Sequence, residues 1–167
     1  HYHYTSLAAT SLYTSLSDLE LFFHAHLEGK NREPIGRNAV KPETIKKMRE
    51  PHGQSMGVEI WGLGTVLYAT TESSDFIIGH DGKSTPPINT AMRLNPETGD
   101  GIIILETGNP TVATKLASEW VFWKTGKVDT FLFPMLIDGM LWAIGIGWAM
   151  IIVIAIAFSI VRRLRMK

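Results

Sequence analysis

The stretch FIIGHDGKSTPPINTAMRLNPETGDGIIILET, residues 76–107, decides the fold. Three segments within it, residues 76–80, 89–94 and 101–107, are apolar and rich in β-branched residues, as strands are. The Gly/Pro-rich sequence DGKSTPP separates the first two segments, and a turn over residues 95–100 joins the second to the third. The stretch therefore predicts consecutive antiparallel strands.

The residues on either side extend this pattern. VEIWGLGTVLYAT, residues 58–70, has the composition of a further strand, which gives a meander of about four strands. After the sheet, Asn109 caps a predicted helix with Pro110 at its first position, and Gly126 ends it. We expect this helix to pack across the sheet. One face of it carries the apolar side chains of Val112, Leu116, Trp120 and Trp123.

Two helices are predicted ahead of the sheet. Ser17-Asp18-Leu19-Glu20 has the form of a capping box, and apolar residues at helical spacing follow it to about residue 28. Lys41-Pro42-Glu43-Thr44 opens a short second helix that runs to about Arg49, and residues 51–55 break it. The predicted fold class is α+β, with an antiparallel sheet flanked by helices.

The C-terminal segment GMLWAIGIGWAMIIVIAIAFSIV, residues 139–161, has no charged residue. A helix of this length crosses a hydrocarbon core of about 30 Å, whereas the alternative, a buried helix of a soluble core, rarely needs to be apolar on every face. We therefore predict a body over residues 1–128, an interfacial linker over 129–138, a transmembrane helix over 139–161 and a basic tail over 162–167. The tail RRLRMK favours a cytoplasmic C-terminus and a periplasmic or extracellular body.

Composition narrows the classes of function. The chain of 167 residues has no cysteine, which excludes disulfides, thiolate zinc sites and a cysteine nucleophile. Four of its 16 basic residues lie in the last six positions, so the body is mildly acidic and nucleic acid is not an expected partner. The chain opens HYHYTSL, with neither Met nor a signal peptide, and we expect it to be the C-terminal part of a longer protein.

Five short motifs follow one another along residues 5–126. They are the Ser/Thr-rich stretch 7–15 before Ser17-Asp18-Leu19, the helix Lys41-Pro42-Glu43-Thr44-Ile45 to Met48, Trp61-Gly62-Leu63-Gly64, Gly79-His80-Asp81-Gly82 with Pro86, and Asn95-Pro96-Glu97. In these motifs and their order the chain resembles the C-terminal part of the serine β-lactamase and penicillin-binding-protein-like hydrolases, in particular the class C β-lactamase and esterase branch.

The resemblance implies a partial β-lactamase/transpeptidase-like fold and three site residues on one strand. His80 would stand where the basic residue of the Lys-Thr-Gly or His-x-Gly motif stands, holding a substrate carboxylate and polarising proton transfer. The backbone N–H of Lys83 would be one oxyanion-hole donor, and Gly82 would leave room for a substrate against the strand edge. No cofactor and no metal are implied.

The family's covalent chemistry is not encoded in this chain. The nucleophile of the family lies in Ser-x-x-Lys, and no serine here has a lysine three residues later. Two classes of function therefore remain. The first is the C-terminal part of a membrane-anchored serine hydrolase, which acts on a small amide or ester substrate once complete. The second is a non-catalytic binding or accessory module at the membrane, and either would need the missing N-terminal part or a partner chain.

Other motifs have ordinary interpretations. Lys124-Thr125-Gly126 matches the family's third motif but lies where a helix should end. His1 with His3, and His24 with His26, have a spacing that does not place two metal ligands on one helix face. Residues 72–75, Glu-Ser-Ser-Asp, predict a solvated hairpin loop rather than a pair of catalytic carboxylates. For His80, a strand-end or core histidine is the alternative to an active-site residue.

Overall fold

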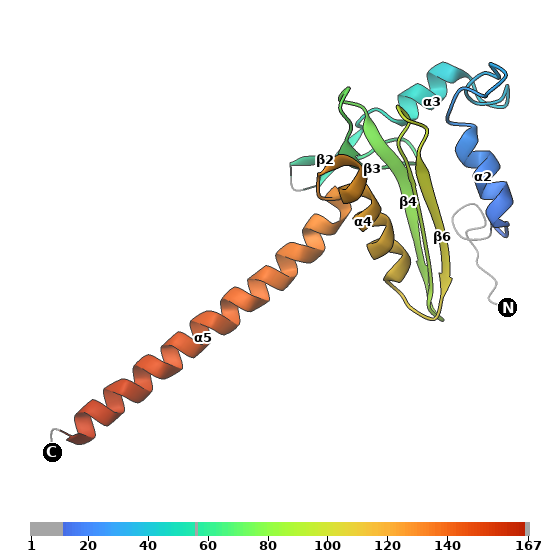
Figure 1. Ribbon diagram of the computed structural model, residues 1–167. Coiled ribbons are helices and arrows are strands. Elements are labelled where there is room, and N and C mark those ends of the chain that lie inside the picture. The colour runs from blue at the N-terminus through green and yellow to red at the C-terminus, as the bar shows by residue number, and fades with distance from the viewer. Residues whose placement is uncertain (1–11, 56, 166–167) are drawn as a thin grey trace. The chain divides into compact units, whose positions relative to one another are not determined.

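The computed structural model describes residues 12–55 and 57–165, and it divides after Thr130 into two compact units (Figure 1). The first unit contains the sheet and its helices, and the second contains the long C-terminal helix. The elements are α2 (Leu16–His24), α3 (Pro42–Met48), β1 (Gly53–Ser55), β2 (Val58–Trp61), β3 (Val66–Thr70), β4 (Phe76–Ser84), β5 (Ile88–Leu94), β6 (Gly101–Thr107), α4 (Val112–Thr125), the 3-10 helix η1 (Thr130–Leu132) and α5 (Phe133–Arg165).

The sheet is an antiparallel meander of six strands in the order β1 to β6, with every strand beside its sequence neighbour. The predicted α+β class and antiparallel sheet are confirmed. The longest ladders are β4 with β5, from Ile78↔Leu94 to Ser84↔Ile88, and β5 with β6, from Ile88↔Thr107 to Leu94↔Gly101. Three long consecutive strands therefore form one side of the sheet, as residues 76–107 predicted, but β4 continues to Ser84, four residues beyond the predicted end at His80.

Different helices pack against the two faces of the sheet (Figure 1). On one face Phe23 of α2 packs against Leu67, Ile78 and Leu94. On the other face the small residues of α4 pack against Ala91 and its neighbours Ile102 and Ile104. Because successive residues of a strand point to opposite faces, each central strand contributes to both cores.

Close packing of α2 depends on a glycine at the start of β6. The ring of Phe23 lies over Gly101, and a Cβ on Gly101 would collide with that ring.

The N-terminus of α2 differs from the prediction. The helix begins at Leu16, one residue earlier than predicted, and its N-cap is Ser15 rather than Ser17. Ser15 Oγ accepts from the Asp18 N–H, and the Asp18 carboxylate accepts from the Ser15 N–H, so the predicted box from Ser17 to Glu20 was wrong.

Two other predicted elements differ in the structure. The single strand predicted over residues 58–70 is two strands, since Gly62 donates its N–H to the Thr65 carbonyl and the chain turns there, with Gly64 at a φ of 72°. The predicted cap Asn109 instead accepts from the Thr111 N–H, and Thr111 is the N-cap of α4. Gly126 ends α4 in the left-handed conformation, as predicted.

The packing face of α4 is also not the predicted one. Ala113, Ala117 and Val121 are fully buried, whereas Leu116 and Trp123 of the predicted face are exposed. Small side chains let the helix approach the sheet closely, so the large apolar residues lie off the contact. This leaves aromatic surface exposed near the end of α4.

The second unit is dominated by α5. Among the described residues, the segment Gly139–Arg165 is long and apolar enough to cross a membrane, and its side chains are almost all exposed. A spanning-length helix was predicted over 139–161. The helix begins at Phe133, within the stretch 129–138 for which we predicted an interfacial linker.

Candidate functional site

The predicted site residues His80, Gly82 and Lys83 all lie on the second half of β4. The first half of β4 pairs with β3 up to Val66↔Gly79, whereas the second half continues to pair with β5 alone. Among the described residues no strand lies on the other edge of residues 80–84. This half-strand therefore presents an open edge beside the three predicted residues.

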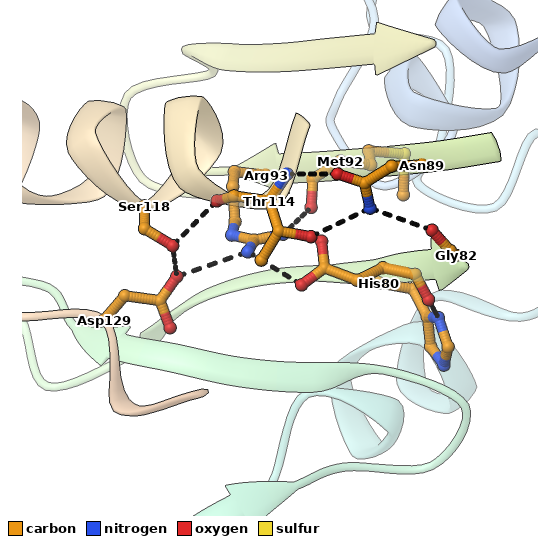
Figure 2. Close-up of polar contacts among 9 residues, drawn as sticks. His80, Gly82, Asn89, Met92, Arg93, Thr114, Ser118 and Asp129 are labelled. Carbon is orange, nitrogen blue, oxygen red and sulfur yellow. Dashed lines mark hydrogen bonds and ion pairs between the residues drawn. The ribbon is translucent and has the colours of Figure 1, made fainter. Parts of the chain in front are cut away.

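His80 is exposed and points to the α2 face of the sheet, in register with Met92. Its ring nitrogen Nδ1 lies 2.8 Å from the carbonyl oxygen of Asp81. Figure 2 shows the ring extending away from the buried polar contacts on the other face. His80 is therefore not a core histidine, and its Nε2 side is free of intramolecular contacts among the described residues.

Gly82 is half-buried beside Thr90 and is held by a side chain that sequence reasoning missed. A Cβ on Gly82 would meet Thr90 Oγ1 on the neighbouring strand. The Gly82 carbonyl accepts from Asn89 Nδ2 at 3.1 Å, and Asn89 is buried. Asn89 in turn exchanges two hydrogen bonds with the first turn of α4, since its Nδ2 donates to Thr114 Oγ1 at 3.1 Å and its Oδ1 accepts from the Thr114 N–H at 3.0 Å (Figure 2).

Lys83 is exposed and pairs with Asn89 across the ladder. The structure therefore brings His80, Gly82 and Lys83 together on one strand, flanked by Asn89. On the face of this half-strand that carries His80, the strand itself adds Ser84, whose hydroxyl donates to the Pro86 carbonyl at 3.3 Å.

A buried charge cluster lies on the opposite face of β4 (Figure 2). The guanidinium of Arg93 is completely buried and donates to Asp81 at 2.8 and 3.1 Å and to Asp129 at 3.2 Å. It also lies 3.4 Å from the ring centroid of Tyr68. Ser118 of α4 donates to Asp129 at 2.9 Å, so the cluster joins the sheet, α4 and the segment after α4.

The electrostatics of the cluster follow from burial and pairing. Burial alone would lower the pKa of Arg93, but the hydrogen bond to Asp81 and the nearby charges raise the pKa of Arg93 above its usual value. Burial raises the pKa of Tyr68 as well, so this phenol stays protonated. The cluster is thus a fixed ion pair network rather than a proton-transfer group. A signal was present in the sequence, since Arg93 is a lone charge within an apolar strand.

The other sequence motifs have structural roles. Lys124-Thr125-Gly126 ends α4, and Lys124 Nζ lies 2.9 Å from Asp100. Residues 72–75 lie in the β3–β4 loop, as predicted, and the carboxylate of Asp75 lies 3.8 Å from the guanidinium of Arg49.

The histidines of α2 and its C-terminal end lie in different environments. His24 is exposed, whereas His26 is buried, and burial, with a smaller effect of Arg49, lowers the pKa of His26. No metal-binding group of His, Cys, Asp or Glu occurs in residues 12–55 and 57–165; His1, His3 and residues 7–11 lie outside them.

A separate cavity of about 400 Å³ lies at the other end of the strands. Lys46 and Arg49 of α3, residues 73–76 and Glu97 line it. It contains none of the predicted site residues, and its cations are balanced by Glu50, Asp75 and Glu97.

No protein-family model, curated protein or solved structure matches this chain. The resemblance to the serine β-lactamase family therefore stays a prediction.

Proposed function

We propose that this chain is the C-terminal portion of a membrane-anchored extracytoplasmic serine hydrolase of the β-lactamase, D-alanyl carboxypeptidase or esterase type. In this proposal the second half of β4 forms one wall of the active site. The observation that carries it is the open edge of residues 80–84, where an exposed histidine stands two residues from a glycine. An extended substrate laid along such an edge would contact the backbone directly.

The proposed chemistry assigns a role to each of the three residues. A serine from the upstream part of the protein attacks the substrate carbonyl and forms an acyl-enzyme, with a neighbouring lysine taking the proton. The backbone N–H of Lys83 and the amide of the serine would stabilise the negative oxygen that develops. His80 would bind the substrate carboxylate through its free ring nitrogen, and Gly82 would keep the path to the strand open.

The outer edge of β6 supports the part of the proposal that adds further chain to this body. Ile102 and Ile104 lie on the α4 face of β6, and Ile103 and Leu105 lie on the α2 face. Edge strands of natural proteins are usually protected by Lys, Pro or bulges, and GIIILET has none of these. Among the described residues β6 is the last strand of the sheet, so its outer backbone edge is where a strand of the proposed longer protein would pair.

The membrane anchor is assigned to α5, with the body outside and the basic tail in the cytoplasm. Protease added to intact cells or spheroplasts should digest the body and spare a tag placed after Lys167. Digestion of the tag with protection of the body would contradict this orientation.

Acylation tests the enzymatic part. In the protein with its upstream sequence, a fluorescent β-lactam or an activated ester should label the serine. His80→Ala should slow labelling by about 10- to 1000-fold, since it removes one polar group beside the developing charge. Lys124→Ala, in the motif that ends α4, should leave the rate unchanged. A normal rate for His80→Ala together with a loss for Lys124→Ala would contradict the placement of the site.

Gly82 requires a paired control because a side chain there also meets Thr90. Gly82→Val should be at least as damaging as His80→Ala. The double variant Gly82→Ala/Thr90→Ala removes the Thr90 hydroxyl from the collision but keeps a Cβ on the face of the half-strand that substrate would contact. We expect it to stay folded and slow, with Thr90→Ala alone near the normal rate. Full activity of the double variant would mean that substrate does not approach Gly82.

The alternative is a non-catalytic binding or accessory module. The observation that favours it is the lack of Ser-x-x-Lys in this sequence. In that case no reagent acylates the protein with its upstream sequence under any condition, although the fold and membrane anchor are unchanged.

A further inference from the structure

An aromatic patch lies at the end of α4 and directly after it. Trp123 is 74% exposed, Phe122 is 53% exposed and Val128 is 52% exposed. The packing of α4 on the sheet uses Ala113 and Ala117 instead, so these three side chains do not contribute to the core of the body. We refer to Phe122, Trp123 and Val128 as the aromatic patch.

Only a short length of chain connects the aromatic patch to the apolar segment of α5. From Val128 to Gly139 the path consists of two residues, the 3-10 turn η1 and the first six residues of α5. These lengths add to at most about 22 Å, at about 3.5, 2.0 and 1.5 Å per residue respectively. The headgroup layer itself is about 5–8 Å thick on each side of the hydrocarbon core. A bilayer crossed by α5 is thus within reach of the aromatic patch.

The segment that joins the patch to η1 is fixed to the sheet rather than free. Lys127 Nζ donates to the carbonyl of Thr70 at 2.7 Å and to its hydroxyl at 2.6 Å. Asp129 pairs with Arg93, and Thr130 Oγ1 lies within 2.9 Å of the carbonyl oxygens of Leu67 and Tyr68. These contacts hold residues 127–130 against the sheet, so the body is ordered up to the residue at which the second unit begins.

The chemistry around the patch suits a lipid surface. Lys124 Nζ lies 4.7 Å from the ring centroid of Trp123 and pairs with Asp100 at 2.9 Å, and the aliphatic stem of Lys124 adds apolar area beside the ring. Tryptophan beside lysine is the composition found at the headgroup level of membranes, where an apolar ring and a polar edge are both accommodated.

We propose that Phe122, Trp123 and Val128 insert into the headgroup–acyl boundary of the same bilayer that α5 crosses, so that the end of α4 rests on the membrane. This inference depends on the membrane anchor proposed above for α5. It adds a second, peripheral contact that fixes the body close to the membrane surface.

Single-cysteine labelling tests the contact, since the native chain has no cysteine. The full chain is reconstituted in vesicles of phosphatidylcholine and phosphatidylglycerol and spin-labelled at one position at a time. The positions are Val128→Cys, which leaves both aromatic residues in place, Ile154→Cys in the apolar helix, and Leu21→Cys, an exposed apolar residue of α2. Accessibility is measured to oxygen, which partitions into lipid, and to a water-soluble nickel complex.

We expect the label at Ile154 to favour oxygen strongly, the label at Leu21 to favour nickel, and the label at Val128 to shift toward oxygen relative to Leu21. In Val128→Cys with Trp123→Ala and Phe122→Ala, that shift should be lost. Lipid accessibility at Ile154 with a Leu21-like result at Val128 would overturn the membrane contact and leave the anchor intact. Nickel accessibility at Ile154 would overturn the anchor and this inference with it. Protection of Val128 from both reagents would show protein on the patch and would also overturn the proposal.

Discussion

Removal of the Arg93 guanidinium should destabilise the body more than any surface substitution. Arg93→Met keeps the length of the side chain and its apolar stem but takes away the cation between Asp81 and Asp129. Arg93 is completely buried, and its hydrogen bonds to the two carboxylates are 2.8 to 3.2 Å long. The variant therefore leaves the buried carboxylate of Asp129 and the largely buried carboxylate of Asp81 without their cation.

The size of the effect follows from this burial. Breaking a buried ion pair by removing one partner costs about 3–5 kcal/mol, because the remaining charge has lost its compensation. Whole domains are stable by only about 5–15 kcal/mol, so the loss is a large fraction of the total. The ion pair of Lys124 with Asp100 serves as the control, since both side chains are partly exposed. Lys124→Met should cost about 0–1 kcal/mol.

Urea unfolding of the full chain in detergent micelles, followed by near-UV circular dichroism, measures both variants. A third variant, Arg93→Met/Asp81→Asn/Asp129→Asn, carries no charge in the cluster. It should recover part of the loss if the uncompensated charge is the cause. A loss for Arg93→Met no larger than that for Lys124→Met would refute the reasoning.

Three further predictions test local features. Ser15→Ala should cost about 1 kcal/mol of unfolding free energy in urea, and Ser17→Ala almost nothing, because only Ser15 caps α2. Burial, with a nearby guanidinium, lowers the pKa of His26 below its ordinary 6.5, so the unfolded chain takes up the proton first. Stability should be complete above about pH 6.5 and fall below it by up to about 1.4 kcal/mol per pH unit, and His26→Phe should remove that slope. Gly101→Ala should cost about 1–3 kcal/mol in a thermal melt by collision with Phe23, and Phe23→Leu in the same chain should recover part of it.

The sheet was predictable because residues 76–107 combine apolar strands with strong turn signals. The 95–100 turn, the β5 and β6 strands and the glycine that ends α4 are all local features. The start of α2 was not decidable in this way. Ser15 and Ser17 each have an acidic residue three positions later, Asp18 and Glu20, so the pattern fits both, and in the structure Ser15 is the N-cap.

The buried charge cluster needed tertiary information. Asp81 and Arg93 lie on one face only through the register in which Asp81 opposes Ala91 and Gly79 opposes Arg93. Asp129 comes from 36 positions further along the chain. Likewise, the large residues of α4 form an apolar face by spacing, yet the alanines make the contact because the sheet is approached closely there. Helical spacing in the sequence identifies the residues of α4 that can be buried together, and tertiary packing determines which of them are buried.

The two faces of β4 connect the cluster to the candidate site. Asp81 is bound by Arg93 on one face, and its neighbours His80 and Gly82 lie on the other, so the ion pair fixes the backbone that carries both. The Asp81 carbonyl also holds the His80 ring, and Asn89 holds the Gly82 carbonyl. A half-strand with an open edge would otherwise fray, because it has ladder hydrogen bonds on one side only. The side chains of Asn89 and Arg93 hold this half-strand in place. Under the proposed hydrolase function, Asn89→Ala should therefore slow acylation while His80 and Lys83 are unchanged, and an unchanged rate would mean that the ladder with β5 alone is sufficient.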